Sequence, residues 1–169
     1  HFEESPTVIH VADSRSGWAR SFRELISLLY AGQVPSIDVS SVRPAGVRLK
    51  TMGGRASGPE PLLELFNFCI DVFKRASGRR LKAIECHDIM CKIGEIVVVG
   101  GVRRSALISL SDLSDREMSH AKSGKWWEND GHRALANNSV SYSKKPDIGT
   151  FLKEWLSLYD SKSGERGIF

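Results

Sequence analysis

The chain has few cysteines, no long apolar run and no internal repeat. Its 169 residues contain three cysteines, and their spacing matches neither a disulfide framework nor a zinc site. No segment approaches the ~18 consecutive apolar residues that a membrane-spanning helix requires. Residues 1–4 have neither the basic nor the apolar part of a secretory signal. We therefore expect a cytoplasmic protein with reduced thiols and no membrane partner.

Long stretches of like charge are also missing. The net charge is +4 and the isoelectric point is about 9.1, but the chain has no run of five or six lysines and arginines. We therefore expect no DNA or RNA binding, whereas a smaller anionic ligand suits a mildly basic surface. The composition, 41% hydrophobic and 26% charged, is that of an ordinary globular protein.

An initiator methionine is absent, and the chain stops at Phe169 without a capping or polar tail. An interior type of strand pattern already begins at Val8. These features predict an internal piece of a larger protein.

Apolar periodicity predicts an alternation of strands and helices. Strands are expected over Thr7–Ala12, Ser36–Val39, Ser105–Leu110 and Ser139–Tyr142. Helices are expected over Trp18–Tyr30, Leu62–Arg75, Ala83–Val98, Asp115–Lys122 and Asp147–Tyr159. This order favours an α/β fold with parallel strands.

The turn after the first predicted strand is a candidate ligand site. Ligands of α/β proteins gather beyond the carboxyl ends of strands, and a helix N-terminus favours an anion. Asp13 would repel a phosphate but suits a ribose hydroxyl, while Arg15 and backbone N–H groups suit the negative charge. The alternative is that Asp13 or Ser14 is only the N-cap of the next helix.

A long irregular stretch, Ser40 to Gly58, is the second candidate. It carries Arg43, Arg48, Lys50 and Arg55 together with three glycines. Loops of this length inside a compact domain are uncommon and are often functional. The four cations could surround a polyphosphate, but a solvated surface loop has the same composition.

The third candidate, Gly100–Ala106, lies between two apolar segments. Its paired glycines allow the backbone to approach a ligand closely. Arg103 and Arg104 are planar forks that suit phosphate or carboxylate. The alternative, a glycine C-cap with both arginines in water, explains a glycine well and the arginine pair poorly.

The three cysteines are expected to be structural. Cys69 lies on the apolar face of its predicted helix, where a thiol behaves as a small hydrophobe. Cys86 and Cys91 are five residues apart and lie on different faces of one helix. The neighbouring His87 and Asp88 do not complete a zinc pattern. We predict no metal site and no catalytic residue in this chain.

Several segments, taken in order, resemble one family. They are Asp13-Ser14-Arg15-Ser16-Gly17-Trp18, Val42-Arg43-Pro44-Ala45-Gly46, Gly53-Gly54-Arg55-Ala56-Ser57-Gly58-Pro59, Gly100-Gly101-Val102-Arg103-Arg104-Ser105-Ala106, Asn137-Asn138-Ser139 and Gly164-Glu165-Arg166-Gly167-Ile168. The chain resembles the catalytic chain of the adenosylcobalamin-dependent, class II ribonucleotide reductases of the ribonucleoside-triphosphate reductase type. The resemblance covers essentially the whole chain.

The resemblance implies a fold and a set of site residues. Residues 1–169 would be part of a single catalytic domain, a ten-stranded α/β barrel that is incomplete at both ends of this chain. Effector binding is implied for Asp13, Ser14, Arg15, Arg43 and Arg48. A substrate and specificity loop is implied for Gly100, Gly101, Val102, Arg103, Arg104 and Ser105, with Ser40 and Ser41 near the substrate phosphates.

The resemblance also implies the chemistry of the whole enzyme. It would reduce ribonucleoside triphosphates or diphosphates to deoxyribonucleotides by cobalamin-initiated thiyl radical chemistry, with adenosylcobalamin bound mainly outside this segment. The partners implied are a ribonucleotide substrate, a deoxynucleoside triphosphate effector and a thioredoxin-like or dithiol reductant. The radical cysteine would lie beyond Phe169. The alternatives are a class I, oxygen-dependent large chain and a non-catalytic nucleotide-binding module.

Overall fold

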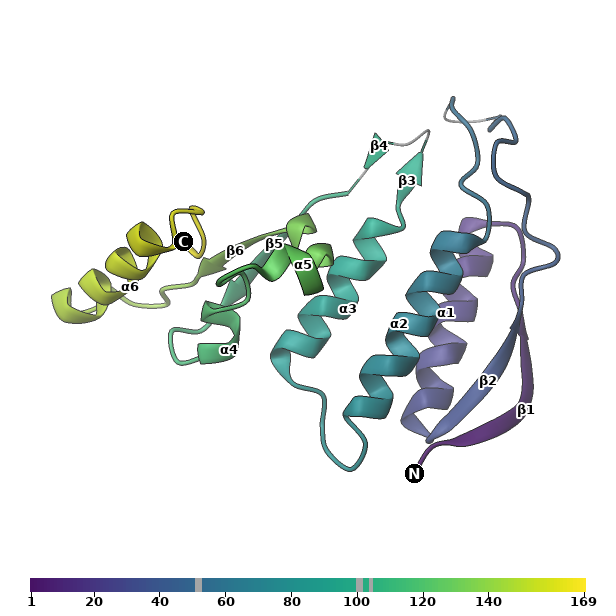
Figure 1. Ribbon diagram of the computed structural model, residues 1–169, viewed down its shortest axis with the longest axis horizontal. Coiled ribbons are helices and arrows are strands. Elements are labelled where there is room, and N and C mark those ends of the chain that lie inside the picture. Colours follow the sequence, from purple (N-terminus) through teal and green to yellow (C-terminus); the bar gives the residue numbers. More distant parts are fainter. Residues whose placement is uncertain (51–52, 100–101, 104) are drawn as a thin grey trace. The chain divides into compact units, whose positions relative to one another are not determined.

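The computed structural model describes residues 1–50, 53–99, 102–103 and 105–169 (Figure 1). They form two compact units: unit 1 is His1–Leu81 with Ile96–Arg104, and unit 2 is Lys82–Glu95 with Ser105–Phe169. Each unit combines helices with a small parallel sheet, so the mixed α/β class is confirmed. No helix in the described part of the chain is both long and apolar enough to cross a bilayer.

Unit 1 is built around a parallel strand pair. Strands β1 (Glu3–His10) and β2 (Gln33–Asp38) are joined by helix α1 (Arg15–Tyr30). Helix α2 (Glu60–Arg75) lies beside α1, as Figure 1 shows. Two short antiparallel strands, β3 (Val98–Val99) and β4 (Val102–Arg103), belong to the same unit.

The core of unit 1 comes from the apolar faces of α1 and α2. Their apolar residues recur at helical spacing, so each helix turns one stripe inward. The rings of Phe22 and Phe66 lie 6.3 Å apart between centroids, and those of Tyr30 and Phe73 lie 5.0 Å apart, edge to face. Cys69 is fully buried in this core, which confirms its structural role in packing.

Unit 2 contains a three-stranded parallel sheet in the order β5, β6, β7. The strands are β5 (Leu107–Ser111), β6 (Ala136–Val140) and β7 (Gly167–Ile168). The helices are α3 (Ala83–Glu95), α4 (Arg116–Ser119), α5 (Trp126–Asn129), the 3₁₀ helix η1 (Gly131–Leu135) and α6 (Ile148–Ser161). Cys91, Leu135 and Ala136 form a buried apolar cluster against which Leu107 packs.

Several predicted boundaries are wrong. The first strand runs over Glu3–His10 rather than Thr7–Ala12, and α4 covers only Arg116–Ser119 of the predicted helix Asp115–Lys122. The helix predicted over Ala83–Val98 ends at Glu95, and Val98 and Val99 form strand β3 instead. The run Ile96–Val99 is β-branched throughout, and β-branched side chains prefer strands. The strand predicted over Ser139–Tyr142 lies earlier in the chain, because β6 runs from Ala136 to Val140 and includes Asn137 and Asn138.

Gly17 has no space for a side chain. A Cβ atom at this buried position of α1 would lie 2.5 Å from the carbonyl oxygen of Ala12 and 2.8 Å from its Cβ. Alanine normally favours a helix over glycine by about 1 kcal/mol, but here the clash is with backbone. We therefore expect Gly17→Ala to lower the free energy of unfolding by about 1–3 kcal/mol, measured by urea titration of the chain with circular dichroism.

Gly131→Ala is the matched control, because no atom lies within 4 Å of the added Cβ. Its free energy of unfolding should stay within about 0.5 kcal/mol of the wild type. A Gly17→Ala variant as stable as this control would contradict the packing described for the start of α1.

Candidate functional site

The turn between β1 and α1 contains three of the predicted effector-binding residues. Ser14 accepts a hydrogen bond from the backbone N–H of Gly17 at 3.0 Å, so it is confirmed as the N-cap of α1. Arg15 is the first residue of the helix and is exposed. The first turn of α1, which the structure describes completely, holds no acidic residue. The positive end of the helix dipole is therefore not neutralised by its own side chains.

Asp13 is paired directly with Arg43. The guanidinium Nε of Arg43 donates to both carboxylate oxygens of Asp13, at 2.8 and 3.0 Å, and the backbone N–H of Arg43 lies 3.3 Å from Oδ1. The Arg43 side chain is 41% exposed and that of Asp13 33%. Partly exposed pairs of this kind contribute about 1 kcal/mol or less. A ligand with its own phosphate or hydroxyl groups can therefore compete for either partner.

The loop that follows folds back on itself. Gly46 N–H donates to the carbonyl of Ala56 at 2.9 Å, and Ala56 N–H donates to that of Val47 at 2.7 Å. These bonds bring Arg48 and Arg55 opposite each other in an antiparallel bridge. Like charges directly opposite each other are unfavourable in a strand pair. The arrangement therefore concentrates positive charge at a place where an anion would relieve the repulsion.

Arg55 is a residue that sequence reasoning placed in the loop but not among the predicted site residues. Its guanidinium donates to the carbonyl of Gly46 at 2.9 Å and so helps to hold the loop together. Its position across from Arg48 depends on the fold of the loop, and the sequence carries no pattern that gives this register. The structure thus adds Arg55 to the cations of this loop.

Ser40 and Ser41 are exposed and follow the end of β2. Asp38 accepts hydrogen bonds from the backbone N–H of Ser40, at 2.9 Å, and from Nδ1 of His10, at 2.8 Å. The hydrogen bonds from Ser40, followed by that from His10, lower the pKa of Asp38 to about 2. The ends of β1 and β2 thus carry an ionised carboxylate beside the predicted substrate serines.

The third predicted loop is described in part. β3 and β4 pair so that Val99 is opposite Val102, with residues 100–101 between them. Gly100, Gly101 and Arg104 lie outside the described residues, while the backbone of Val102 and Arg103 forms β4. Ser105 is partly buried, and its hydroxyl donates to the carbonyl of Gly94 at 2.7 Å.

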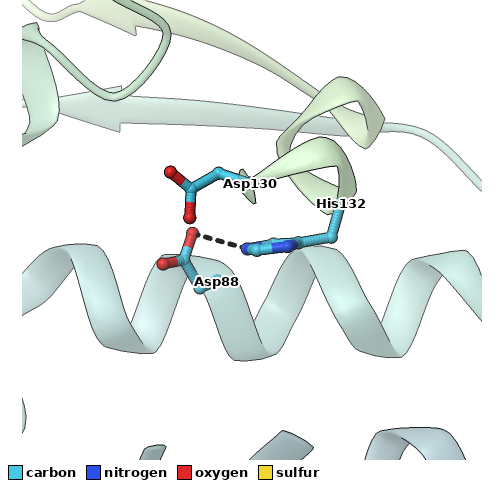
Figure 2. A group of neighbouring side chains, drawn as sticks. All are labelled: Asp88, Asp130 and His132. Atoms are coloured by element: carbon cyan, nitrogen blue, oxygen red, sulfur yellow. Dashed lines mark ion pairs between the residues drawn. The ribbon is translucent and has the colours of Figure 1, made fainter. Parts of the chain in front are cut away.

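Unit 2 contains a buried ion cluster that sequence reasoning missed. Asp88 on α3 accepts two hydrogen bonds from the guanidinium of Arg133, at 2.6 and 2.7 Å. His132 Nε2 lies 3.0 Å from the same carboxylate. The dashed line in Figure 2 marks this ion pair. Asp130 is 3.2 Å from the Arg133 guanidinium. Asp88 and Arg133 are far apart in the sequence, so no spacing could have revealed this pair.

The electrostatics of this cluster favour an ion pair rather than a metal site. Burial alone would raise the pKa of Asp88, but the hydrogen bonds from Arg133, His132 and His87 lower it well below its usual range. Asp88, Asp130 and His132 are close enough to share a cation (Figure 2). The guanidinium of Arg133 already neutralises Asp88, so the group needs no metal for charge balance.

The same network reaches β6. The side-chain amide nitrogen of Asn138 lies 3.1 Å from Nε2 of His87, and its backbone N–H donates to Glu165 at 2.7 Å. Glu165 is paired with Lys122 at 2.8 Å, and Lys122 also donates to the carbonyl of Ala136. The Asn138 residue is 4% exposed. These contacts tie α3, β6 and the segment before β7 into one polar core.

The cysteines fit the structural interpretation. Burial raises the pKa of Cys69 to about 12 and that of Cys91 to about 11. Both are therefore thiols at neutral pH and poor nucleophiles. Cys86 is exposed, as expected for the opposite face of α3. It lines a hollow of about 410 Å³ in unit 2, together with residues of β5 and α4.

Comparison with known proteins identifies similar sequences and a similar structure. Residues 2–73, which include β1, α1, β2 and most of α2, match the family model for the insertion domain of B12-dependent ribonucleotide reductase. A solved structure of a B12-dependent, class II ribonucleotide reductase is 29% identical, with a TM-score of 0.69. That match covers 80% of this chain and 19% of the other.

Curated relatives agree with this match. The adenosylcobalamin-dependent ribonucleoside-triphosphate reductase of Lactobacillus leichmannii is 36% identical over 76% of this chain and 18% of its own length. The reductase of the same name from Lacticaseibacillus paracasei strain ATCC 334 is 32% identical over 99% of this chain and 23% of its own length. The chain thus spans about a fifth of the length of the curated relatives that it matches.

The Asp88 carboxylate should make stability depend on pH in acid. Its native pKa is lowered, so its contribution is fully present above the unfolded pKa of about 4 and is lost as the pH falls toward the native pKa. Asp88→Asn should lower the free energy of unfolding by about 3 kcal/mol at pH 7, because Arg133 loses the buried carboxylate that binds it bidentately. The difference between the two proteins should shrink below pH ~4. Urea titrations between pH 7 and 3 measure both effects.

Asp71→Asn removes an exposed carboxylate and serves as the control. Its free energy of unfolding should stay within about 0.5 kcal/mol of the wild type at every pH tested. If the Asp88→Asn and wild-type curves kept a constant separation down to pH ~3, the carboxylate would not be the source of the stabilisation.

Proposed function

Because the chain belongs to the B12-dependent ribonucleotide reductase family, we propose that it is the nucleotide-responsive part of an adenosylcobalamin-dependent ribonucleoside-triphosphate reductase. The whole enzyme would reduce ribonucleoside triphosphates, or diphosphates, to deoxyribonucleotides. The 32% identity to the Lacticaseibacillus paracasei enzyme extends over 99% of this chain and carries the assignment. In this proposal unit 2 contributes strands to the ten-stranded barrel, and residues 2–73 are an insertion within the same catalytic domain.

The first site of the proposal is an effector site in unit 1. Asp13 would accept a hydrogen bond from a ribose hydroxyl, and Arg43 and Arg48 would bind the phosphates of a deoxynucleoside triphosphate. Ser14 and Arg15 form the start of α1, where the positive end of the helix dipole faces no acidic side chain of the first turn. The supporting observations are the first turn of α1 without an acidic residue, the contact of Arg43 with Asp13 just before that helix, and the like-charged Arg48–Arg55 bridge within the same loop as Arg43. Binding of the effector would exchange the exposed Asp13–Arg43 pair for contacts to the nucleotide.

The second site of the proposal is the loop that follows α3. Gly100, Gly101, Val102, Arg103, Arg104 and Ser105 would lie between effector and substrate and transmit the identity of the effector base. Ser40 and Ser41 would contact substrate phosphates. A coupling of this kind is a free energy shared between two binding events, so the substrate must change the affinity of the effector by the same factor.

The hollow in unit 2 is too small for adenosylcobalamin. It measures about 410 Å³ and has a mixed lining of apolar side chains, serines of β5, Cys86, His87 and the carboxylates Asp112 and Asp115. Cavities of about 300–1,000 Å³ hold drug-sized ligands, and adenosylcobalamin is several times larger. In this proposal adenosylcobalamin binds mainly outside this segment, and a thioredoxin-like or dithiol reductant serves the whole enzyme.

Removal of the two phosphate-binding cations tests the effector site. In the full-length reductase, the double substitution Arg43→Ala, Arg48→Ala should weaken deoxynucleoside triphosphate binding at least about 100-fold. Each charged hydrogen bond contributes about 1.5–3 kcal/mol, and the freed Asp13 carboxylate would repel the phosphates. Isothermal titration calorimetry measures the affinity.

The double substitution Arg20→Ala, Arg23→Ala is the control, because it removes the same charge from exposed positions of α1. Its effector affinity should stay within about twofold of the wild type. Equal affinities for the two double variants would refute the effector site proposed for unit 1.

The specificity loop is tested by kinetics. Arg103→Ala, Arg104→Ala should reduce the effector-induced change in kcat/KM between two ribonucleotide substrates by about tenfold, within the usual range of coupling energies. Effector affinity should change little, because neither arginine belongs to the proposed phosphate site. The control Lys144→Ala, Lys145→Ala removes two adjacent lysines from exposed positions outside the loop. Substrate preference that still follows the effector after loss of Arg103 and Arg104 would exclude their role.

A further inference from the structure

Gly94 and Ser105 form a hydrogen bond at the base of the hairpin that carries the proposed specificity loop. Both residues belong to unit 2, whereas the chain between them, residues 96–104, is assigned with unit 1. The chain therefore leaves unit 2 after Glu95 and returns at Ser105. The Ser105 hydroxyl donates to the carbonyl of Gly94 at 2.7 Å. This bond joins the end of α3 to the residue at which the chain returns to unit 2 after residues 96–104.

The acceptor is a carbonyl that needs a partner. Gly94 is the penultimate residue of α3, and the last four carbonyls of an α-helix have no partner within the helix. Gly94 is buried, and a Cβ atom there would lie 2.1 Å from Cδ2 of Leu135 and 3.1 Å from the Ser105 hydroxyl. The end of α3 is thus packed closely against η1, which fixes the position of the acceptor.

The body that holds the acceptor is itself rigidly connected. One α3 residue, Asp88, is bound bidentately by Arg133, and the preceding residue, His87, contacts Asn138 on β6. Cys91 packs with Leu135 and Ala136 in the buried cluster. A hydroxyl that binds the end of α3 therefore connects the hairpin to a buried polar and apolar core. The hydrogen bond from Ser105 to Gly94 is sufficient to make this connection.

We propose that Ser105 is a positioning residue for substrate specificity, and that it acts through its hydrogen bond to Gly94 rather than through contact with a nucleotide. This inference rests on the proposed function of the loop. A loop transmits a displacement from one ligand to another only when its ends are held, because a free end absorbs the displacement. Ser105 holds the returning end.

The test compares three variants of the full-length reductase. Ser105→Ala removes the hydroxyl, Ser105→Thr retains it, and Ser119→Ala removes a different serine hydroxyl that donates to a helix carbonyl, that of Arg116, at 2.8 Å. The readout is the ratio of kcat/KM for two ribonucleotides, with and without effector. We expect Ser105→Ala to reduce the effector-induced change in this ratio about 3- to 10-fold, as loss of one neutral hydrogen bond implies.

The same experiment separates positioning from general damage. The affinity for the effector, measured without substrate, should stay within about twofold of the wild type in Ser105→Ala, because Ser105 lies outside the proposed effector site. Ser105→Thr should retain at least about half of the effector response, and Ser119→Ala should retain all of it. A full effector response in Ser105→Ala, or equal losses in the alanine and threonine variants, would overturn the proposal.

Hydrogen exchange provides a second, independent measurement. Ser105→Ala should exchange faster over residues 95–107, while peptides from residues 86–92 of α3 should remain as protected as in the wild type. Unchanged exchange over residues 95–107 would overturn the proposal even if Ser105→Ala lost activity. If Ser105→Ala keeps its effector response while the Arg103→Ala, Arg104→Ala variant loses it, only the anchor is refuted. If both variants keep the response, the proposed function of the loop is refuted as well.

Discussion

A carboxylate that is withdrawn from water must be compensated by positive charge and hydrogen bonds, and Asp88 meets this condition in unit 2. Arg133 binds it with two nitrogens, and His132 lies against the same oxygens. Removal of one member of a buried pair typically costs about 3–5 kcal/mol, because the other charge is left without compensation. Since Asp88 lies on α3 and Arg133 in η1, the pair fixes how these two elements pack. The placement of Gly94 against Leu135, and so of the Ser105 anchor, follows from this packing.

Local elements of the fold were predictable because their signals are local. Apolar spacing predicted the helices that became α1, α2 and α6, and Ser14 was predicted as one of two N-cap candidates. Errors arose where the same local sequence pattern is compatible with two kinds of secondary structure. The run Ile96–Val99 continues the apolar pattern of α3, but its last two β-branched residues form strand β3. Asn138 resembles a turn residue, yet His87 and Glu165 satisfy its amide nitrogen and backbone N–H inside β6.

For the candidate sites, the sequence likewise revealed which residue types are present but not which of them are in contact. The cations of residues 40–58 and the carboxylate of Asp13 were visible in the sequence as separate ligand candidates. Their direct contact was not, because Asp13 and Arg43 meet only when the loop after β2 returns to the end of β1. The Arg48–Arg55 bridge likewise depends on the register of a folded loop. Residue types thus indicated the kind of ligand, while the fold determined which side chains can act on it together.

The two kinds of ion pair in this chain suit different tasks. The Asp88–Arg133 pair is shielded from water, so its exchange for another partner would leave a buried charge and is unfavourable. The Asp13–Arg43 pair is exposed to about a third or more of each side chain, so either partner can pass to a ligand at little cost. A protein that responds to a nucleotide needs both kinds of pair. A weak ion pair can open when a ligand binds, but the resulting change reaches another site only if the structure between the two sites is rigid. The neutral bond from Ser105 to Gly94 connects the residue after β4 to that shielded network. Under the proposed function, the strength of this one bond would limit how far the effector can influence the substrate site through the loop.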